Sequence, residues 1–244
     1  MRILSWNILH GGGSRRRHIL DAIAAHQPHI VTLQEFRPAD GPDDMLDGLN
    51  RLGLGQQYVA PTEGRRDNGL LVAARLPFEA APFPLGVAGP IHCIQARFGH
   101  EPVTALRLIA VRFPQREAQI PLFNALLDLP ADYLQGQSIL IGDFNCGIPF
   151  EDSDTRTFYA TALFQQLLRQ GWVDAWRSRH RHAREFSWIS HPRRNGFRYD
   201  HALASAHLDA RIAAVEYDHA VREAGYSDHS ALLLDIADRR PATI

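Results

Sequence analysis

Apolar and polar positions follow one another along this chain mostly in short runs, which is the pattern of β-strands. Runs rich in β-type residues and bounded by turn-forming residues predict strands at 2–7, 29–33, 57–60, 69–74, 92–98, 103–113, 138–144, 172–176, 186–189, 198–204, 213–217 and 231–236. Helical spacing predicts helices after Ser14, which can cap the first one, at about 121–134 and at 155–170. In the first of them Ile19, Leu20 and Ile23 share one face.

Such a mixture of many short strands with few helices exceeds what one doubly wound sheet holds. We therefore expect an α/β fold in four layers, a sandwich of two mixed β-sheets packed face to face with helices on the outside. The segment 138–144 is strongly apolar, as in a strand that is buried on both faces. No repeat, low-complexity segment or long linker divides the 244 residues, so a single domain over 1–244 is expected.

Composition places the chain among ordinary globular proteins, with about 45% apolar and 22% charged residues. No apolar run approaches the roughly 20 residues that cross a bilayer. The strand-like start carries no secretion signal, so a cytoplasmic location is expected. Cys93 and Cys146 fit neither a disulfide framework nor a zinc spacing. No obligate protein partner is indicated.

The formal net charge of −1 gives no overall attraction for a polyanion, so a nucleic-acid substrate would have to meet a local basic patch. Every fixed cation is arginine, because the chain contains no lysine. Arginine binds phosphate with two hydrogen bonds, but a bias this complete is better explained by the base composition of the genome.

Polar residues recur where the predicted apolar strands begin or end. They are Asn7, Glu35, Asp143, Asn145, Asp200, Asp228 and His229. Carboxylates and amides beside buried strands are costly without a partner, so their recurrence indicates convergence on one rim around a cation. Oxygen donors suit Mg²⁺, with Mn²⁺ as a substitute, better than they suit zinc. Taken alone, Asn7 or Asp143-Phe144-Asn145 could be turn chemistry, and Glu35 could be a surface carboxylate that follows a strand.

Five ordered segments resemble the signature motifs of the endonuclease/exonuclease/phosphatase superfamily, and together they span nearly the whole chain. They are Ser5-Trp6-Asn7, Leu33-Gln34-Glu35, Ile141-Gly142-Asp143-Phe144-Asn145, Arg198-Tyr199-Asp200-His201 and Ser227-Asp228-His229. One tripeptide carries little weight, but five in order at domain-scale spacing do not arise readily by chance. The resemblance implies a Mg²⁺-dependent hydrolase of phosphate esters.

The resemblance also implies a set of metal ligands. Glu35 would be the principal ligand, supported by Asn7 and by Asp228 directly or through water. Two residues beyond Asn7, however, abasic-site endonucleases usually carry Asp or Asn, whereas this chain has Leu9. A supplementary contact to the metal or to its water is therefore missing.

The catalytic roles that the resemblance implies follow from in-line attack at phosphorus. Asp143 would orient or deprotonate the attacking water, and Asn145 would hold that carboxylate and the phosphate in register. His229, kept cationic by Asp200, would donate to a non-bridging phosphate oxygen. Many relatives place Tyr or His where this chain has Arg112, and an arginine can clamp a phosphate oxygen but cannot readily protonate a leaving group.

Within the superfamily, the stretch 171–205 resembles the exonuclease III and abasic-site endonuclease branch most. In those relatives an aromatic loop borders the sugar-phosphate pocket. By this resemblance Trp188 and Phe197 could stack on a base or ribose, and Arg193 and Arg194 could meet the phosphates. Phe186 and Trp188 also alternate as strand residues that only fill a core would do.

Three functions stay open: a nuclease acting on DNA or RNA, which is favoured, a phosphatase or phosphodiesterase of a small or lipid-headgroup phosphate ester, and a non-catalytic nucleic-acid-binding module. The retained motif residues argue against the last. A long basic groove through 15–17, 177–184 and 193–194 would favour nucleic acid, and a closed pocket would favour a small ester. His180 and His182 could form a metal pair, but the arginine-rich run around them indicates a solvated segment.

Overall fold

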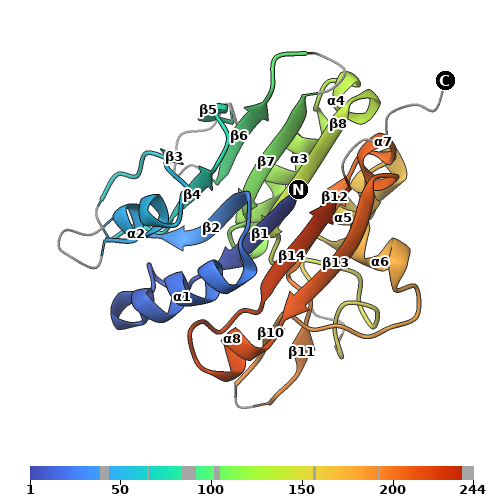
Figure 1. Cartoon of the computed structure of the whole chain (residues 1–244). Helices are drawn as coiled ribbons and strands as arrows, with labels where there is room; N and C mark the ends of the chain where they lie inside the picture. The colour runs from blue at the N-terminus through green and yellow to red at the C-terminus, as the bar shows by residue number, and fades with distance from the viewer. Residues whose placement is uncertain are drawn as a thin grey trace.

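Two six-stranded sheets face each other in the computed structural model, which describes residues 1–38, 44–64, 66–83, 92–101, 105–155, 158–191 and 193–237. Figure 1 shows the blue β1 beside the red β14, although they come from opposite ends of the chain. The prediction of two mixed sheets with helices around them is confirmed. Parts of two predicted elements, 103–104 of a strand and 156–157 of a helix, lie outside the described residues.

The first sheet is mixed because β1 runs parallel to β2, whereas its other neighbouring strands are antiparallel. Its order is β13 (Ile212–Asp218), β14 (Ala231–Ile236), β1 (Arg2–Asn7), β2 (Ile30–Phe36), β4 (Gly69–Ala74) and β3 (Gln56–Val59). Asn7, the last residue of β1, is registered with Gln34 of β2. The ends of β1 and β2 therefore lie at one edge of this sheet.

The second sheet has the same design, because only β7 and β8 run parallel. Its order is β5 (Glu79–Pro82), β6 (Cys93–Phe98), β7 (Leu106–Arg112), β8 (Gln137–Asp143), β12 (Asp200–Ala204) and β9 (Val173–Asp174). Asp143, the last residue of β8, is registered with Arg112 on one side and with Asp200 on the other. A separate hairpin is formed by β10 (Trp188–Ile189) and β11 (Gly196–Phe197).

Helices cover the outer face of each sheet. The helices are η1 (Gly13–Arg15), α1 (Arg16–His26), α2 (Met45–Arg51), η2 (Arg116–Ala118), α3 (Gln119–Leu127), α4 (Asp132–Gln135), α5 (Thr161–Gln170), α6 (Ala175–Arg179), α7 (Ala206–Asp209) and α8 (Ala220–Glu223). Ile19 and Ile23 of α1 share an apolar cluster with the first sheet, and Phe123 of α3 and Phe164 of α5 share one with the second. No helix in the described ranges is both long and apolar enough to cross a membrane.

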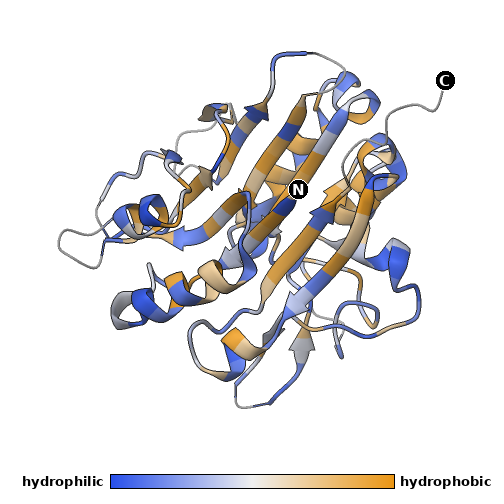
Figure 2. Cartoon of the chain, viewed as in Figure 1, coloured by the Kyte–Doolittle hydropathy of each residue, from blue (hydrophilic) through white to orange (hydrophobic). Residues whose placement is uncertain are grey.

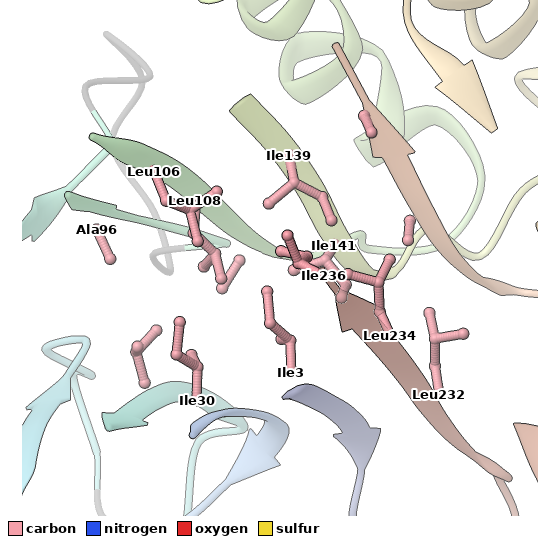
Figure 3. Packing of buried hydrophobic residues seen from close by; sticks show 14 of the residues in the cluster. Ile3, Ile30, Ala96, Leu106, Leu108, Ile139, Ile141, Leu232, Leu234 and Ile236 are labelled. Carbon is pink, nitrogen blue, oxygen red and sulfur yellow. The ribbon is translucent and has the colours of Figure 1, made fainter. Parts of the chain in front are cut away.

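The central core lies between the sheets, as Figure 3 shows. Ile3, Ile30 and Leu234 from the first sheet meet Leu108 and Ile141 from the second. Figure 2 shows the corresponding concentration of hydrophobic colour along the strands. Because successive strand residues point to opposite faces, every second position of β1, β7, β8 and β12 faces this core. The polar residues at the strand ends continue those inward-facing rows.

Four local predictions are wrong. The predicted helix at 155–170 begins only at Thr161, so the described residues before it form a loop. The predicted helix at 121–134 is two helices, α3 and α4, because Pro130 lacks a backbone N–H and cannot continue a helix. The predicted strand at 172–176 stops after Asp174, whose side chain accepts from the N–H groups of Trp176 and Arg177 and caps α6. Ser14 lies inside η1, and α1 begins without a side-chain cap.

Candidate active site

Polar residues from both sheets meet at the open end of the sandwich. Asn7 is in register with the inward row of β1, Asp143 with that of β8 and Asp200 with that of β12. Asp143 and Asp200 also face each other across the β8–β12 pairing. Side chains alternate between the two faces of a strand, so the rows that place Ile3 and Ile141 in the core also place polar side chains at its rim.

Glu35 reaches this rim through an irregularity in β2. The pairing of β2 with β4 shifts between Gln34 and Phe36, so that Glu35 is the extra residue of a β-bulge. Its φ of 57° lies in the left-handed region, where a residue with a side chain costs about 1–2 kcal/mol. In a regular strand Glu35 would share the outward face of Val31 and Leu33, which pack against the helices. The bulge turns the carboxylate toward Asn7 instead.

The Asn7 amide joins the two carboxylates. Its Nδ2 lies 3.0 Å from Oδ2 of Asp143 and 3.5 Å from Oε1 of Glu35. Its Oδ1 accepts a hydrogen bond from the Leu9 backbone N–H at 3.1 Å. In this orientation Asn7 lies between Glu35 and Asp143, and its Nδ2 donor points toward both carboxylates.

Asp143 is held on its other side by Asn145. The Asn145 backbone N–H donates to Oδ1 of Asp143 at 2.9 Å, and Nδ2 of Asn145 donates to the Phe113 carbonyl at 2.8 Å. Burial raises the pKa of Asp143 to about 6; the nearby His229 charge opposes that rise and the Asp200 charge adds to it. A buried carboxylate with a pKa in this range is suited to accept a proton from water near neutral pH.

His229 and Asp200 form a buried pair across the gap between the sheets. Nδ1 of His229 lies 2.8 Å from Oδ2 of Asp200. Burial alone would lower the pKa of His229, but the Asp200 carboxylate outweighs it and raises that pKa to about 10. The His229 backbone is fixed by hydrogen bonds from its N–H to Ser227 and from the Trp6 indole to its carbonyl. The structure thus holds the side chain of His229 in place as an imidazolium.

A single cavity of about 730 Å³ joins these groups. Its lining contains all the predicted metal and catalytic residues except Asp200, which lies behind His229. The lining residues are Asn7, His10, Glu35, Asn68, His92, Arg112, Phe113, Pro114, Gln115, Arg116, Gln119, Asp143, Asn145, Tyr159, Trp188, Tyr199, Asp228 and His229. A volume of this size suits a ligand of nucleotide dimensions.

The chemistry of the donor set fits a hard divalent cation. Glu35 and Asp228 present carboxylate oxygens to the same cavity, and carboxylate, amide and water oxygens are the usual ligands of Mg²⁺. In the described part of the chain, no group of three or more His, Cys, Asp or Glu residues forms a metal cluster, so water or substrate oxygens would complete the shell. The amide orientation given above would have to change before Asn7 itself could offer an oxygen.

The predicted substrate residues are divided between the cavity and other places. Trp188 lines the cavity, and its indole N–H donates to Oδ2 of Asp228 at 2.9 Å. Phe197 is only 6% exposed and stacks beneath Tyr199, so it supports that ring and does not face the cavity. Arg193 and Arg194 are exposed in the turn between β10 and β11 and do not line the cavity.

Several cavity residues carry no motif by which the sequence could have indicated them. His10 donates its backbone N–H to Oε2 of Glu35 at 2.9 Å, and its ring also approaches that oxygen. Asn68 comes from a loop that pattern analysis leaves unassigned, and Tyr159 lies in a loop where pattern analysis predicts part of the helix 155–170. Burial and the neighbouring Arg112 charge lower the pKa of His92 to about 4, so a neutral histidine also lines the wall.

A buried ion cluster lies under the strand that carries Asp200. The Arg198 guanidinium contacts Asp152 and Asp174, each at 2.6 Å, and lies 5.0 Å from the Trp176 ring centroid. All three charged side chains are buried. The cluster ties β9, the segment just before β12 and the 146–155 loop together.

Comparisons with known proteins give a consistent picture. The profile of the Endonuclease/Exonuclease/phosphatase family matches residues 4–229 of this chain. No curated protein sequence matches it.

Similar solved structures include an AP endonuclease from Archaeoglobus fulgidus, with 19% identity, 97% of this chain and 99% of that chain covered, and a TM-score of 0.80. They also include a 3′ phosphatase from Neisseria bound to a product DNA hairpin, with 21% identity, coverage of 98% and 100%, and a TM-score of 0.81. A 3′-5′ exonuclease from Neisseria meningitidis has 22% identity, coverage of 98% and 100%, and a TM-score of 0.80. At these identities the likeness shows a shared fold over essentially the whole chain.

Proposed function

Because this chain belongs to the endonuclease/exonuclease/phosphatase family, as its five ordered segments predicted, we propose that it hydrolyses phosphodiester bonds of nucleic acid with the help of a divalent cation. We propose Mg²⁺ as that cation, with Mn²⁺ as a substitute, and the single domain 1–244 as the acting unit. The solved structures of similar fold include one in which a 3′ phosphatase is bound to DNA, which supports a nucleic-acid substrate.

The observation that carries this proposal is that a proton-accepting carboxylate and a positioned cation meet at one cavity. Asp143, held by Asn145 and Asn7, is a buried carboxylate placed to take a proton. His229, paired with Asp200, is a cation placed to meet an anionic oxygen. Hydrolysis of a phosphate ester needs both functions at once.

In the proposed reaction the oxygen of a water molecule attacks phosphorus, and the bond to the ester oxygen breaks. The ester oxygen leaves and takes up a proton from solvent to become a hydroxyl group. Asp143 orients that water and accepts its proton, while Asn145 keeps the carboxylate in place. His229 donates a hydrogen bond to a non-bridging phosphate oxygen, where negative charge builds up. Arg112 clamps another phosphate oxygen. When bound by Glu35, Asp228 and Asn7, the cation supplies Lewis-acid stabilisation of the phosphate charge.

One observation favours a smaller phosphate ester as the second candidate substrate. Arg112 and Arg116 are the arginines that line the cavity within the described residues. Three of the arginines expected to form a long basic groove are paired with carboxylates of the protein, Arg177 with Asp152, Arg179 with Asp209 and Arg184 with Asp154. Arg193 and Arg194 are exposed but do not line the cavity. A short strand, a strand end or a small ester therefore suits this surface better than a long duplex.

A substrate panel with Mg²⁺ tests the proposal: abasic duplex, 3′-phosphorylated DNA, single-stranded DNA, RNA, inositol phosphates and sphingomyelin. We expect hydrolysis of a nucleic acid, loss of that activity with EDTA and recovery with Mg²⁺ or Mn²⁺. Activity confined to inositol phosphates or sphingomyelin would favour the small or lipid-headgroup ester. Undiminished activity in EDTA would contradict the metal requirement, and binding without hydrolysis of any substrate would leave the binding module.

A further inference from the structure

One aromatic side chain at the cavity rim has no role in the chemistry above. Tyr159 lies in the loop before α5 and lines the cavity beside Arg116. Tyr159 is 52% exposed, whereas the other aromatic residues of the cavity lining, Phe113, Trp188 and Tyr199, are buried or half-buried. Within the described residues no other aromatic ring contacts it, whereas Trp188, Phe197 and Tyr199 contact one another.

The loop holds Tyr159 in this outward position. Its two neighbours, Phe158 and Ala160, are both buried, and Phe158 packs edge-on against Phe197 and Tyr199. The next residue, Thr161, donates its hydroxyl to the Gly147 carbonyl at 3.1 Å. The hydroxyl of Tyr159 lies near Glu117 of η2, and desolvation together with the Glu117 charge raises the pKa of Tyr159. The backbone on both sides of Tyr159 is therefore held in place, and the ring is presented to solvent at the rim.

The chemistry of this wall is that of a nucleotide subsite. Arg112 and Arg116 supply cations that suit phosphate oxygens, and Tyr159 adds a flat ring on the same cavity. Bases stack on aromatic side chains whatever their sequence, and such stacking strengthens binding substantially. A small inositol or lipid headgroup has no flat ring to occupy this place.

We propose that Tyr159 is a base-stacking residue and that this subsite takes a nucleobase of a single-stranded or frayed substrate strand. This inference rests on the proposed function and deepens it, because it selects strands that carry bases over other phosphate esters.

The test compares two single strands with the same phosphate backbone: fluorescein-labelled oligothymidylate and a strand made only of base-free tetrahydrofuran spacers. Binding is measured by fluorescence anisotropy in the full chain carrying Asp143→Asn, so that neither strand is cut. In that background Tyr159→Ala should weaken binding of oligothymidylate about 5- to 150-fold. Binding of the spacer strand should stay unchanged. Tyr159→Phe keeps the ring and should bind as the parent does.

Phe150 gives a matched control, since it is also 52% exposed but does not line the cavity. Phe150→Ala should bind both strands as the parent does. Equal weakening of both strands by Tyr159→Ala, or no weakening of either, would overturn the stacking role, and so would a Tyr159→Phe variant as weak as Tyr159→Ala.

Hydrolysis by the wild-type protein separates this inference from the proposed function. If the wild type cuts oligothymidylate but Tyr159→Ala does not distinguish the two strands, only the stacking role fails. If the wild type cuts neither strand under Mg²⁺ and no nucleic acid of the wider panel, the nuclease proposal fails and the stacking role falls with it.

Discussion

Nδ1 of His229 lies 2.8 Å from Oδ2 of Asp200, and this contact joins the two sheets at the site. Asp200 begins β12 of the second sheet, while His229 lies just before β14 of the first. The pair therefore links the two sheets beside the cavity. It also places a negative charge behind the imidazole, on the side away from the cavity.

Replacing Asp200 with Asn should lower turnover by about 10²- to 10³-fold, because His229 loses the charge that keeps it cationic. Single-turnover hydrolysis of oligothymidylate measures this. Asp218→Asn is the matched control, since Asp218 lies 2.7 Å from His26 in an equivalent pair that is not part of the cavity. A normal rate for Asp200→Asn, or an equal loss for Asp218→Asn, would contradict the role given to His229.

Asp143→Asn should lower turnover by about 10²- to 10⁴-fold without weakening the fold. The pKa of Asp143 is raised to about 6 in the folded protein, so at pH 8 its charge opposes folding, and the neutral amide removes that penalty. Melting temperatures at pH 8 should be equal to or higher than that of the wild type. Near-normal hydrolysis would remove Asp143 from the mechanism, and a large drop in melting temperature would make it a structural residue.

Arg198→Met should destabilise the protein by about 3–5 kcal/mol, because it leaves the buried carboxylates of Asp152 and Asp174 without their cation. Urea unfolding followed by far-UV circular dichroism gives the free energy of unfolding. Arg193→Met, at an exposed arginine, is the control and should leave that free energy unchanged. Equal stability of the two variants would show that the ion cluster does not hold this region.

The same cluster predicts a loss of stability in acid. The Arg198 guanidinium holds the pKa values of Asp152 and Asp174 below their usual range, despite the opposing effect of burial. A carboxylate whose pKa is lower in the folded than in the unfolded state stabilises the fold at pH values above its unfolded-state pKa. This contribution is lost as the pH falls through its folded-state pKa. The free energy of unfolding should therefore decline progressively below about pH 4, and less steeply in a variant carrying both Asp152→Asn and Asp174→Asn. A flat profile in the wild type would count against the lowered pKa values.

Gly142→Ala should reduce both stability and activity. The φ of Gly142 is 145°, and a Cβ at this position would overlap the Val111 carbonyl oxygen in the β7–β8 pairing. Relief of that overlap would displace the neighbouring Asp143. Thermal unfolding and hydrolysis rates check this, with Gly64→Ala as the control, because a Cβ there meets Asp67 at an ordinary 3.4 Å. A Gly142→Ala protein with normal activity would mean that β8 tolerates the shift.

The inward-facing site residues could be predicted from the sequence because strand periodicity and motif order act together. Asn7 and Asp143 end strands whose alternating apolar residues fill the core between the sheets, so the same rule that gives the fold also points these side chains inward. The family and the two-sheet sandwich followed from the same observations.

What the sequence could not provide depends on contacts between distant segments. Asp152, Asp174 and Arg198 show no common pattern, because their pairing exists only after the fold brings three elements together. Phe197 was expected at the pocket, but its ring is buried and stacks beneath the ring of Tyr199. Tyr159 was expected inside the helix 155–170, but it lies in the loop before α5, where the helical pattern no longer indicates which side chains are exposed.

The extra residue in β2 has a consequence for protein engineering. Removing Glu35, the one residue between Gln34 and Phe36, would restore an uninterrupted ladder with β4, but it would also delete the carboxylate that the bulge presents to the cavity. A shortened variant would therefore become more regular and lose the proposed metal affinity in the same step. Transplanting this site into another scaffold would require copying the residue count of the segment as faithfully as the identity of its glutamate.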